Sequence, residues 1–183
     1  MKQTLFTLLV ISIIMTSCQK EIDPFLISTQ SVGLLTDSTQ VKDIKTIFAK
    51  DSVVTKIAGD EFLGNVNDIE IYEKGGKHLL SLSPKQALDS TATIGTVKII
   101  DSRYKTEKGL NTLSTFSDIK TDYKISNIEN TLRNVVVFVN DNNMYFTIAK
   151  QELPANLRFD MTQDIEAIQI PGAAKIKFFM VGW

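Results

Sequence analysis

The stretch GLLTDSTQVKDIKTIF at residues 33–48 recurs, one residue shorter, as GLNTLSTFSDIKTDY at residues 109–123. Both copies contain the tetrapeptide Asp-Ile-Lys-Thr, at 43–46 and at 118–121. Apolar residues lie at i, i+3 and i+7 in each copy, which predicts a short helix with one apolar stripe. The stripes are Val41, Ile44 and Phe48 in the first copy, and Phe116, Ile119 and Tyr123 in the second.

The ends of these helices are also predicted from residue type. Thr39 and Ser114 are the expected N-caps, because a hydroxyl can accept from the first free amides of a helix. Asp43 and Asp118 follow in the first turn, where the helix dipole favours negative charge. We interpret the recurrence as an internal duplication; a chance similarity of two capped helices is the alternative.

Segments rich in β-branched residues, separated by turn signals, follow each helix and predict β-strands. They are 52–57, 68–72, 78–82 and 95–100 after the first helix, and 124–128, 134–139, 144–149, 165–170 and 176–181 after the second. The expected fold class is therefore α+β, with two fused, pseudo-repeated units that each pack a short helix on an antiparallel β-meander.

Three local signals refine the strands. Gly75-Gly76 predicts a hairpin, and Asn140-Asp141-Asn142-Asn143 can supply the positive φ angles of a tight turn. The run 135–139 is apolar at every position, which predicts a strand in the middle of a sheet covered on both faces. The apolar end of the chain at 178–183 is expected to be a docked strand.

The first residues of the chain carry a different signal. Lys2 precedes an apolar run from Leu5 to Met15, and Thr16-Ser17 lead to Cys18, the only cysteine. This pattern is typical of a secretory signal, and it resembles the lipobox of bacterial lipoproteins, although Met15 stands where that motif has Leu. The resemblance implies that Cys18 becomes the acylated first residue of the mature protein and anchors it to the outer membrane, on its periplasmic or cell-surface face.

A membrane-spanning helix is the alternative for this run. It needs about 20 apolar residues, whereas the run here is shorter and contains Thr7 and Ser12. We therefore expect a signal peptide at 1–17, a lipidated tether at 18–31, and one body formed by a first half at 32–104 and a second half at 105–183. Gln19–Asp23 resembles the lysine-plus-acidic signal for export to the cell surface; a solvated linker is an equally good interpretation.

The arrangement of each half resembles small periplasmic lipoprotein domains of the outer-membrane-assembly and β-lactamase-inhibitor type. The resemblance lies in a Gly-x(4–5)-Thr-x-x-(Asp/Glu)-(Ile/Val) turn-helix ahead of a meander. The tract 95–123 resembles a family of uncharacterised Gram-negative lipoproteins. These resemblances imply a fold and a compartment, and they carry over no catalytic residue.

Composition narrows the classes of partner. The 20 basic and 21 acidic residues give a net charge of −1, which disfavours nucleic acid, since phosphate binding needs clustered Lys and Arg. With Cys18 acylated, no thiol remains for a disulfide, a nucleophile or a zinc cluster. We expect no cofactor and no metal, and partners limited to the membrane and an envelope protein. The oligomeric state stays open.

Candidates for chemistry are few. His78 is the single histidine and would need Ser81 or Asp68 nearby to form a catalytic group. The acids Asp60, Glu61, Asp68, Glu70 and Glu73 could serve glycoside hydrolysis or hold calcium, but their spacing favours solvated strand faces. Gly75-Gly76-Lys77 lacks the Ser or Thr of a phosphate loop.

Aromatic residues complete the candidates. Most are expected in the core, and Tyr104, Tyr145 and Trp183 are the aromatic residues best placed for a carbohydrate or peptide groove. The leading hypothesis is a non-catalytic binding or assembly-accessory module. The alternative is a carboxylate-based hydrolase of envelope or surface glycans.

The lipid anchor is directly testable. Replacing Cys18 with Ser removes the thiol that receives the diacylglyceryl group, so the chain should remain an unprocessed precursor. Metabolic labelling with a clickable palmitate analogue should mark the native protein and leave the Cys18→Ser variant unmarked. A labelled variant would contradict the assignment.

Overall fold

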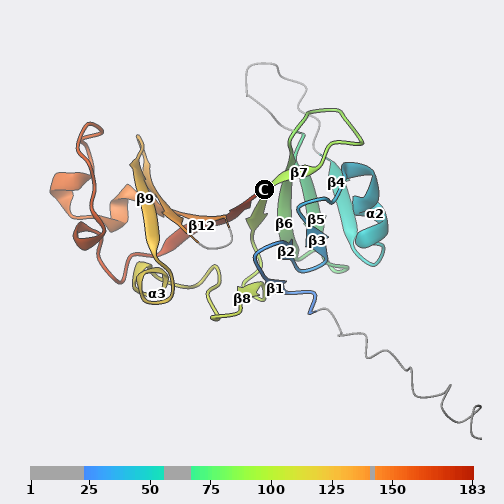
Figure 1. The fold of residues 1–183 in the computed structure, drawn as a ribbon, viewed down its shortest axis with the longest axis horizontal. Coiled ribbons are helices and arrows are strands. Elements are labelled where there is room, and N and C mark those ends of the chain that lie inside the picture. The colour runs from blue at the N-terminus through green and yellow to red at the C-terminus, as the bar shows by residue number, and fades with distance from the viewer. Residues whose placement is uncertain (1–22, 56–66, 141–142) are drawn as a thin grey trace, which may run out of the picture.

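The computed structural model describes residues 23–55, 67–140 and 143–183. Within these ranges one eight-stranded antiparallel sheet is flanked by short helices and a smaller four-stranded sheet, as Figure 1 shows. The predicted α+β class is confirmed.

The large sheet has the strand order β4-β5-β6-β7-β12-β11-β10-β9. Its first four strands are β4 (Ser52–Thr55), β5 (Ile69–Tyr72), β6 (His78–Pro84) and β7 (Ile94–Ile99). Its last four are β9 (Ile125–Asn130), β10 (Asn134–Val139), β11 (Met144–Ala149) and β12 (Ile176–Gly182). Each set is a meander in chain order, and the two sets join where β7 pairs with β12, with Val97 opposite Val181 and Ile99 opposite Phe179.

The small sheet has the order β3-β2-β1-β8. It consists of β1 (Leu26–Ile27), β2 (Ser31–Val32), β3 (Leu35–Thr36) and β8 (Lys105–Thr106). Because β1 pairs with β8 in parallel, the beginning of the described chain is held against the segment that connects the two meanders.

The tether is therefore shorter than predicted. We expected it to continue to residue 31, but Ile27 is fully buried in the core, and Ser31 already pairs with Thr36. The apolar residues Phe25, Leu26 and Ile27 explain the difference, since they gain more by packing than by remaining in solvent. The first part of the expected tether, 18–22, and the signal peptide lie outside the described residues.

Both predicted helices are present. The first begins as the 3₁₀ helix η1 (Val41–Asp43) and continues as α2 (Ile44–Ile47); the second is α3 (Phe116–Asp122). Ile44 and Ile119 are both buried, as expected from the apolar stripes, whereas Lys45 and Lys120 point to solvent. The phase of each stripe is confirmed.

The predicted N-caps are each one residue too early. Gln40 caps η1, and Thr115 caps α3 in a capping box with Asp118. The hydroxyls of Thr39 and Ser114 instead accept from the backbone N–H three residues before them, at 2.9 and 3.1 Å, and so close the turn that leads into each helix.

The start of each helix is tied to the sheet in the same way. Gln40 bridges to Thr93 just before β7, and Thr115 bridges to Lys175 just before β12. The next two amides in each helix donate to the preceding parts of those segments: Val41 to Ala92, Lys42 to Ser90, Phe116 to Ala174 and Ser117 to Gly172. In each half, the helix is therefore attached to the segment that leads into the strand at which the two halves meet.

Two strand predictions are wrong. Residues 165–170 contain the 3₁₀ helix η4 (Ala167–Gln169), because the Gln169 side chain accepts from the Glu166 amide and withdraws it from any strand ladder. The apolar run 135–139 forms β10, which lies next to the edge strand β9 and is covered on one face only. Val135 and Val137 are buried, whereas Val136 and Phe138 are half-buried.

The predicted turns are present where the structure describes their residues. Gly75 and Gly76 have φ angles of +120° and +93° in the β5–β6 hairpin, a region that favours glycine. Asn143 has a φ of +50° in the β10–β11 turn, and Asp141 and Asn142 of that turn lie outside the described residues.

The remaining elements lie in the connection from β11 to β12. They are the 3₁₀ helices η2 (Lys150–Glu152) and η3 (Ala155–Leu157). Leu153, Leu157, Ile165 and Ile170 of this connection are buried and extend the core beneath the second meander.

The two buried isoleucines allow a matched test of the helix packing. Ile44→Ala and Ile119→Ala should each lower the free energy of unfolding by about 2–5 kcal/mol, through lost transfer energy and the cavity left behind. Urea denaturation of residues 19–183 measures this. Lys45→Ala and Lys120→Ala, one residue later in each helix, should be nearly neutral, and a silent isoleucine variant would contradict the packing.

Candidate functional site

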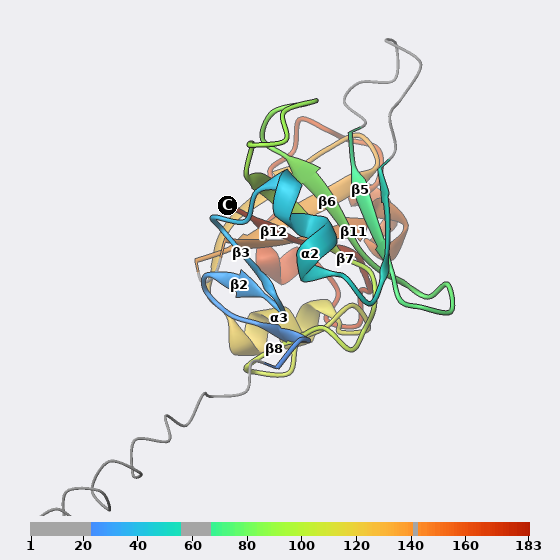
Figure 2. The ribbon, with the colours of Figure 1, turned by 90° about the vertical axis from the view of Figure 1, so that its right-hand side faces the viewer.

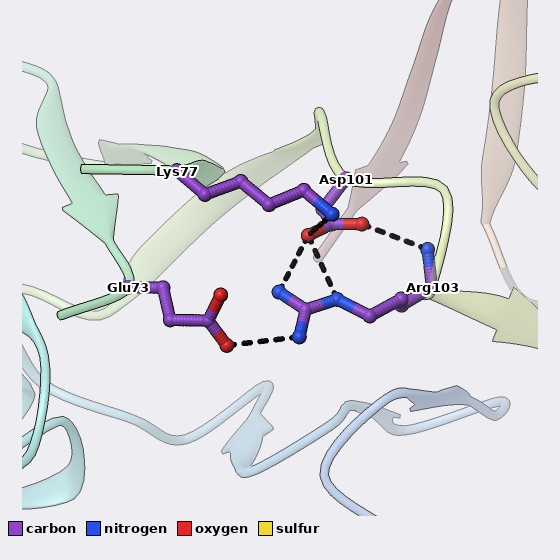
Figure 3. Close-up of polar contacts among 4 residues, drawn as sticks. All are labelled: Glu73, Lys77, Asp101 and Arg103. Carbon is purple, nitrogen blue, oxygen red and sulfur yellow. Dashed lines mark hydrogen bonds and ion pairs between the residues drawn. The ribbon is translucent and has the colours of Figure 1, made fainter. Parts of the chain in front are cut away.

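A buried carboxylate organises the turn after β7. Asp101 has a fully buried side chain, and four donors surround it (Figure 3). Its Oδ2 accepts from Arg103 Nε at 2.9 Å, from Arg103 Nη2 at 2.7 Å and from Lys77 Nζ at 3.0 Å. Its Oδ1 accepts from the Arg103 backbone N–H at 2.9 Å. A planar guanidinium suits this arrangement, because it presents two parallel N–H groups to one carboxylate.

Arg103 extends the network in two further directions. Its Nη1 donates to Glu73 Oε1 at 2.8 Å, which reaches the β5–β6 hairpin. Its guanidinium carbon lies 4.6 Å from the centroid of the Phe25 ring, and Phe25 meets Tyr104 edge-to-face at 5.0 Å. The network therefore joins the hairpin, the β7–β8 turn and the start of the described chain.

The electrostatics of this network are those of a structural ion cluster. Burial by itself raises the pKa of Asp101, but hydrogen bonds from Arg103 and Lys77 and the charge of Arg103 together lower it to about 2. The hydrogen bond from Arg103 lowers the pKa of Glu73 as well. Burial raises the pKa of the Tyr104 hydroxyl, so that residue stays protonated. A catalytic acid needs a carboxyl pKa shifted upward, and both shifted carboxyls here go downward.

The other sequence candidates are distributed over separate contacts. His78 Nε2 lies 2.7 Å from Glu70 Oε2, and its ring stacks on Tyr72 at 4.4 Å. Asp68 accepts from the Ser83 hydroxyl at 2.6 Å. The structure thus pairs His78 with Glu70, whereas Ser81 and Asp68 were the partners expected from the sequence. Asp60 and Glu61 lie outside the described residues.

Lys77 of the Gly75-Gly76-Lys77 sequence donates to Asp101, so the lysine belongs to the ion cluster. Beside the hairpin lies an open cleft of about 1010 Å³ between residues 49–52 and 72–76. Its lining mixes the basic residues Lys50 and Lys74 with the acidic residues Asp51 and Glu73, which gives it no charge preference.

The face of the large sheet opposite the core carries a continuous cross-strand row. From β4 to β9 the paired residues are Val54, Glu70, Ser81, Lys98, Met180, Tyr145, Phe138 and Asn127. Glu70 and Ser81 are buried, and the other six are half-buried or exposed. We call this surface the open face.

Aromatic rings and lysines gather on the open face over β7, β12, β11 and β10. Phe138 and Tyr145 stack on one another at 5.5 Å. The Lys98 ammonium lies 3.9 Å and the Lys177 ammonium 5.2 Å from the centroid of the Phe178 ring. These contacts hold half-buried rings that are still partly exposed to solvent.

A shallow cleft of about 350 Å³ lies at one end of this surface, lined by Phe138, Tyr145 and Trp183 together with Gly95 and Gly182. Tyr145 and Trp183 were expected to be accessible, and both are half-buried at this cleft. The expectation for Tyr104 is wrong: it is buried, because Phe25 covers its ring and Gly33 packs beside it.

The described residues form neither a metal-binding cluster nor a membrane-spanning helix. Over 23–55, 67–140 and 143–183, no three His, Cys, Asp or Glu side chains are grouped as a metal site requires. No helix in those ranges is long and apolar enough to cross a bilayer.

Neither a protein-family model nor a curated protein matches this sequence. Among solved structures the chain is similar to the crystal structure of the uncharacterized protein yfeY from Escherichia coli, with a TM-score of 0.54 and 18% sequence identity. The match covers 86% of this chain and 99% of that one. At this identity the likeness concerns the fold alone.

The cluster around Asp101 was missed by sequence reasoning. The only local signal is the short turn Asp101-Ser102-Arg103 directly after a buried strand, in which the acid accepts the amide two residues on. Glu73 and Lys77 lie far earlier in the chain, so no spacing rule connects them to this turn.

Asp101 makes stability depend on pH in a defined direction. Its folded pKa lies below the unfolded value of 3.8, so its carboxylate stabilises the fold above about pH 4, and this contribution is lost as the pH falls towards 2. Asp101→Asn should lower the free energy of unfolding by about 3–5 kcal/mol at neutral pH. The difference from the native protein should shrink between pH 5 and pH 2.

Urea denaturation at several pH values measures this dependence. The exposed Asp37, in the turn after β3, offers the matched control, and Asp37→Asn should change stability by less than about 0.5 kcal/mol. A difference for Asp101→Asn that stays constant with pH would contradict the role of its charge.

Proposed function

We propose that this chain is a lipid-anchored, non-catalytic binding or assembly-accessory module of the bacterial cell envelope. The observation that carries the proposal is the open face, where Phe138, Tyr145, Met180 and Phe178 remain half-buried although the opposite face holds a complete core. The signal pattern ending at Cys18 supports attachment to the outer membrane, with either face of that membrane left open.

The chemistry of the open face suits a protein partner. Protein interfaces are enriched in aromatic residues and Met, which supply large buried area at low entropic cost. Lys98 and Lys177 add two positive charges beside the Phe178 ring. An acidic or aromatic segment of a partner would complement such a surface, since charge pairs guide encounter and rings anchor the contact.

The alternative, a carboxylate-based glycan hydrolase, has less support among the described residues. Hydrolysis of this kind needs two carboxyls facing one substrate, one of them with a raised pKa. Glu70 is paired with His78, Asp68 with Ser83, and Glu73 with Arg103. These acids hold the strands and hairpins to one another, which leaves them poorly placed to attack a sugar.

We also propose that the two halves descend from one duplicated unit. Each helix start makes the same three backbone contacts to the segment that leads into the last strand of its own meander. Where the halves meet, Val97 pairs with Val181 and Ile99 with Phe179, on either side of the pair Lys98 and Met180. A two-fold axis through that central pair would exchange the two meanders.

Site-specific photo-crosslinking in intact membranes tests the binding role. A photoreactive phenylalanine analogue at Tyr145, on the open face, should give a discrete adduct with an envelope protein, identifiable by mass spectrometry. The same analogue at the exposed Lys120 of α3 is the control and should give none. The charge reversal Lys98→Glu should weaken the Tyr145 adduct, and identical adducts from both positions would argue against a specific face.

The hydrolase alternative has its own readout. The native protein, Glu70→Gln and Glu73→Gln should all release no reducing ends from isolated envelope glycans. Release that disappears in Glu70→Gln would favour the enzyme over the binding module.

A further inference from the structure

The distance between the lipid attachment and the folded body is limited by the chain. Only four residues lie between Cys18 and Asp23, so the two are five residue steps apart. A fully extended chain spans at most about 3.6 Å per residue, so Asp23 lies within about 18 Å of an acylated Cys18.

No slack is gained after Asp23, because the chain is clamped there. The Asp23 carboxylate accepts from the Phe25 amide at 2.9 Å, and the Phe25 carbonyl accepts from the Lys105 amide at 3.0 Å. Gly33, with a φ of +56°, packs so closely that a Cβ there would lie 2.2 Å from the Pro24 carbonyl oxygen. Phe25 is further held between Arg103 and Tyr104.

We propose that the surface around this clamp rests on the phospholipid bilayer that carries the anchor. The proposal rests on the lipid anchor of the proposed function. We call this surface the membrane-facing edge; it comprises the β2–β3 turn, β8 and the connection from β8 to α3. In Figures 1 and 2 these elements lie at the lower edge of the molecule, where the described chain begins.

The residues of this edge suit a lipid surface. Leu113, in the β8–α3 connection, is 78% exposed, and Leu34, beside the clamped Gly33, is 43% exposed. Lys105 is exposed on β8, whereas the ammonium of the nearby Lys108 donates to the Asp122 carbonyl oxygen and lies 4.3 Å from the centroid of the Tyr123 ring. Apolar side chains that enter the headgroup region, with lysines directed to anionic lipids, are the elements by which proteins lie on a membrane.

The opposite edge offers a matched control. Leu132, 67% exposed, lies in the β9–β10 hairpin, which Figure 1 shows at the upper edge. Leu113 and Leu132, one exposed leucine at each edge, therefore differ chiefly in how far they lie from the clamp.

The test uses the mature acylated protein, which begins at Cys18, reconstituted in vesicles of phosphatidylethanolamine and phosphatidylglycerol with brominated acyl chains. Acylation consumes the only native thiol, so Leu113→Cys and Leu132→Cys each introduce a single site for an environment-sensitive fluorophore. The label at 113 should be quenched at least about twofold more strongly than the label at 132, because bromine quenches only at short range within the bilayer. Urea denaturation of both labelled variants confirms that they are folded.

The outcomes separate the two proposals. Equal quenching at both positions, or stronger quenching at 132, overturns the membrane-facing edge while the anchor stands. Mass spectrometry of the vesicle-bound protein reports the acyl groups on Cys18, and their absence overturns the anchor and the edge together.

Discussion

The pairing of β7 with β12 is the contact on which the architecture depends. Each meander of four strands has one apolar face and a helix to cover it, but a four-stranded unit of this size buries little surface. When β7 and β12 pair, the two meanders become one sheet, and Val97, Ile99, Phe179 and Val181 form a continuous centre for a shared core. The pairing also removes two of the four sheet edges that separate meanders would expose.

The ion cluster is a direct consequence of where β7 ends. The chain must turn sharply from the core towards β8, and Asp101 enters the protein interior at that point. A buried carboxylate is costly unless donors surround it, and Arg103 and Lys77 supply them. Because Arg103 also contacts Glu73 and Phe25, the same carboxylate fixes the β5–β6 hairpin and the beginning of the folded chain.

These constraints leave the molecule with two contrasting surfaces. The clamp around Pro24 and Phe25 places the chain start at one edge, and the short stretch back to Cys18 keeps that edge near the proposed anchor. The open face, with its stacked rings and lysines, remains available along the sheet. In the proposed function one surface rests on the bilayer and the other binds a partner, and anchoring would raise the effective concentration for a weak second contact.

Much of the fold followed from local patterns in the sequence. The apolar stripes of the two helices and the β-branched runs depend on periods of 3.6 and 2 residues, which are properties of the backbone, and Ile44 and Ile119 are buried as their phase requires. The predicted boundaries of helices and strands were wrong where a side chain hydrogen-bonds a backbone amide, as at Thr39, Ser114 and Gln169. The run 135–139 misled because a continuous apolar run does not reveal whether a second layer covers the sheet.

The candidate site was less predictable. The aromatic residues Tyr145 and Trp183 were identified as accessible, but the row that surrounds them required the strand order. The burial of Tyr104 required the docking of Phe25, and the Asp101 cluster joins acidic and basic residues up to 30 positions apart in the sequence. The sequence by itself determined the elements and the α+β class, because these arise from near-neighbour periodicity. Only the tertiary structure decided which faces stay open and which charges meet, because both depend on contacts between residues that are distant along the chain.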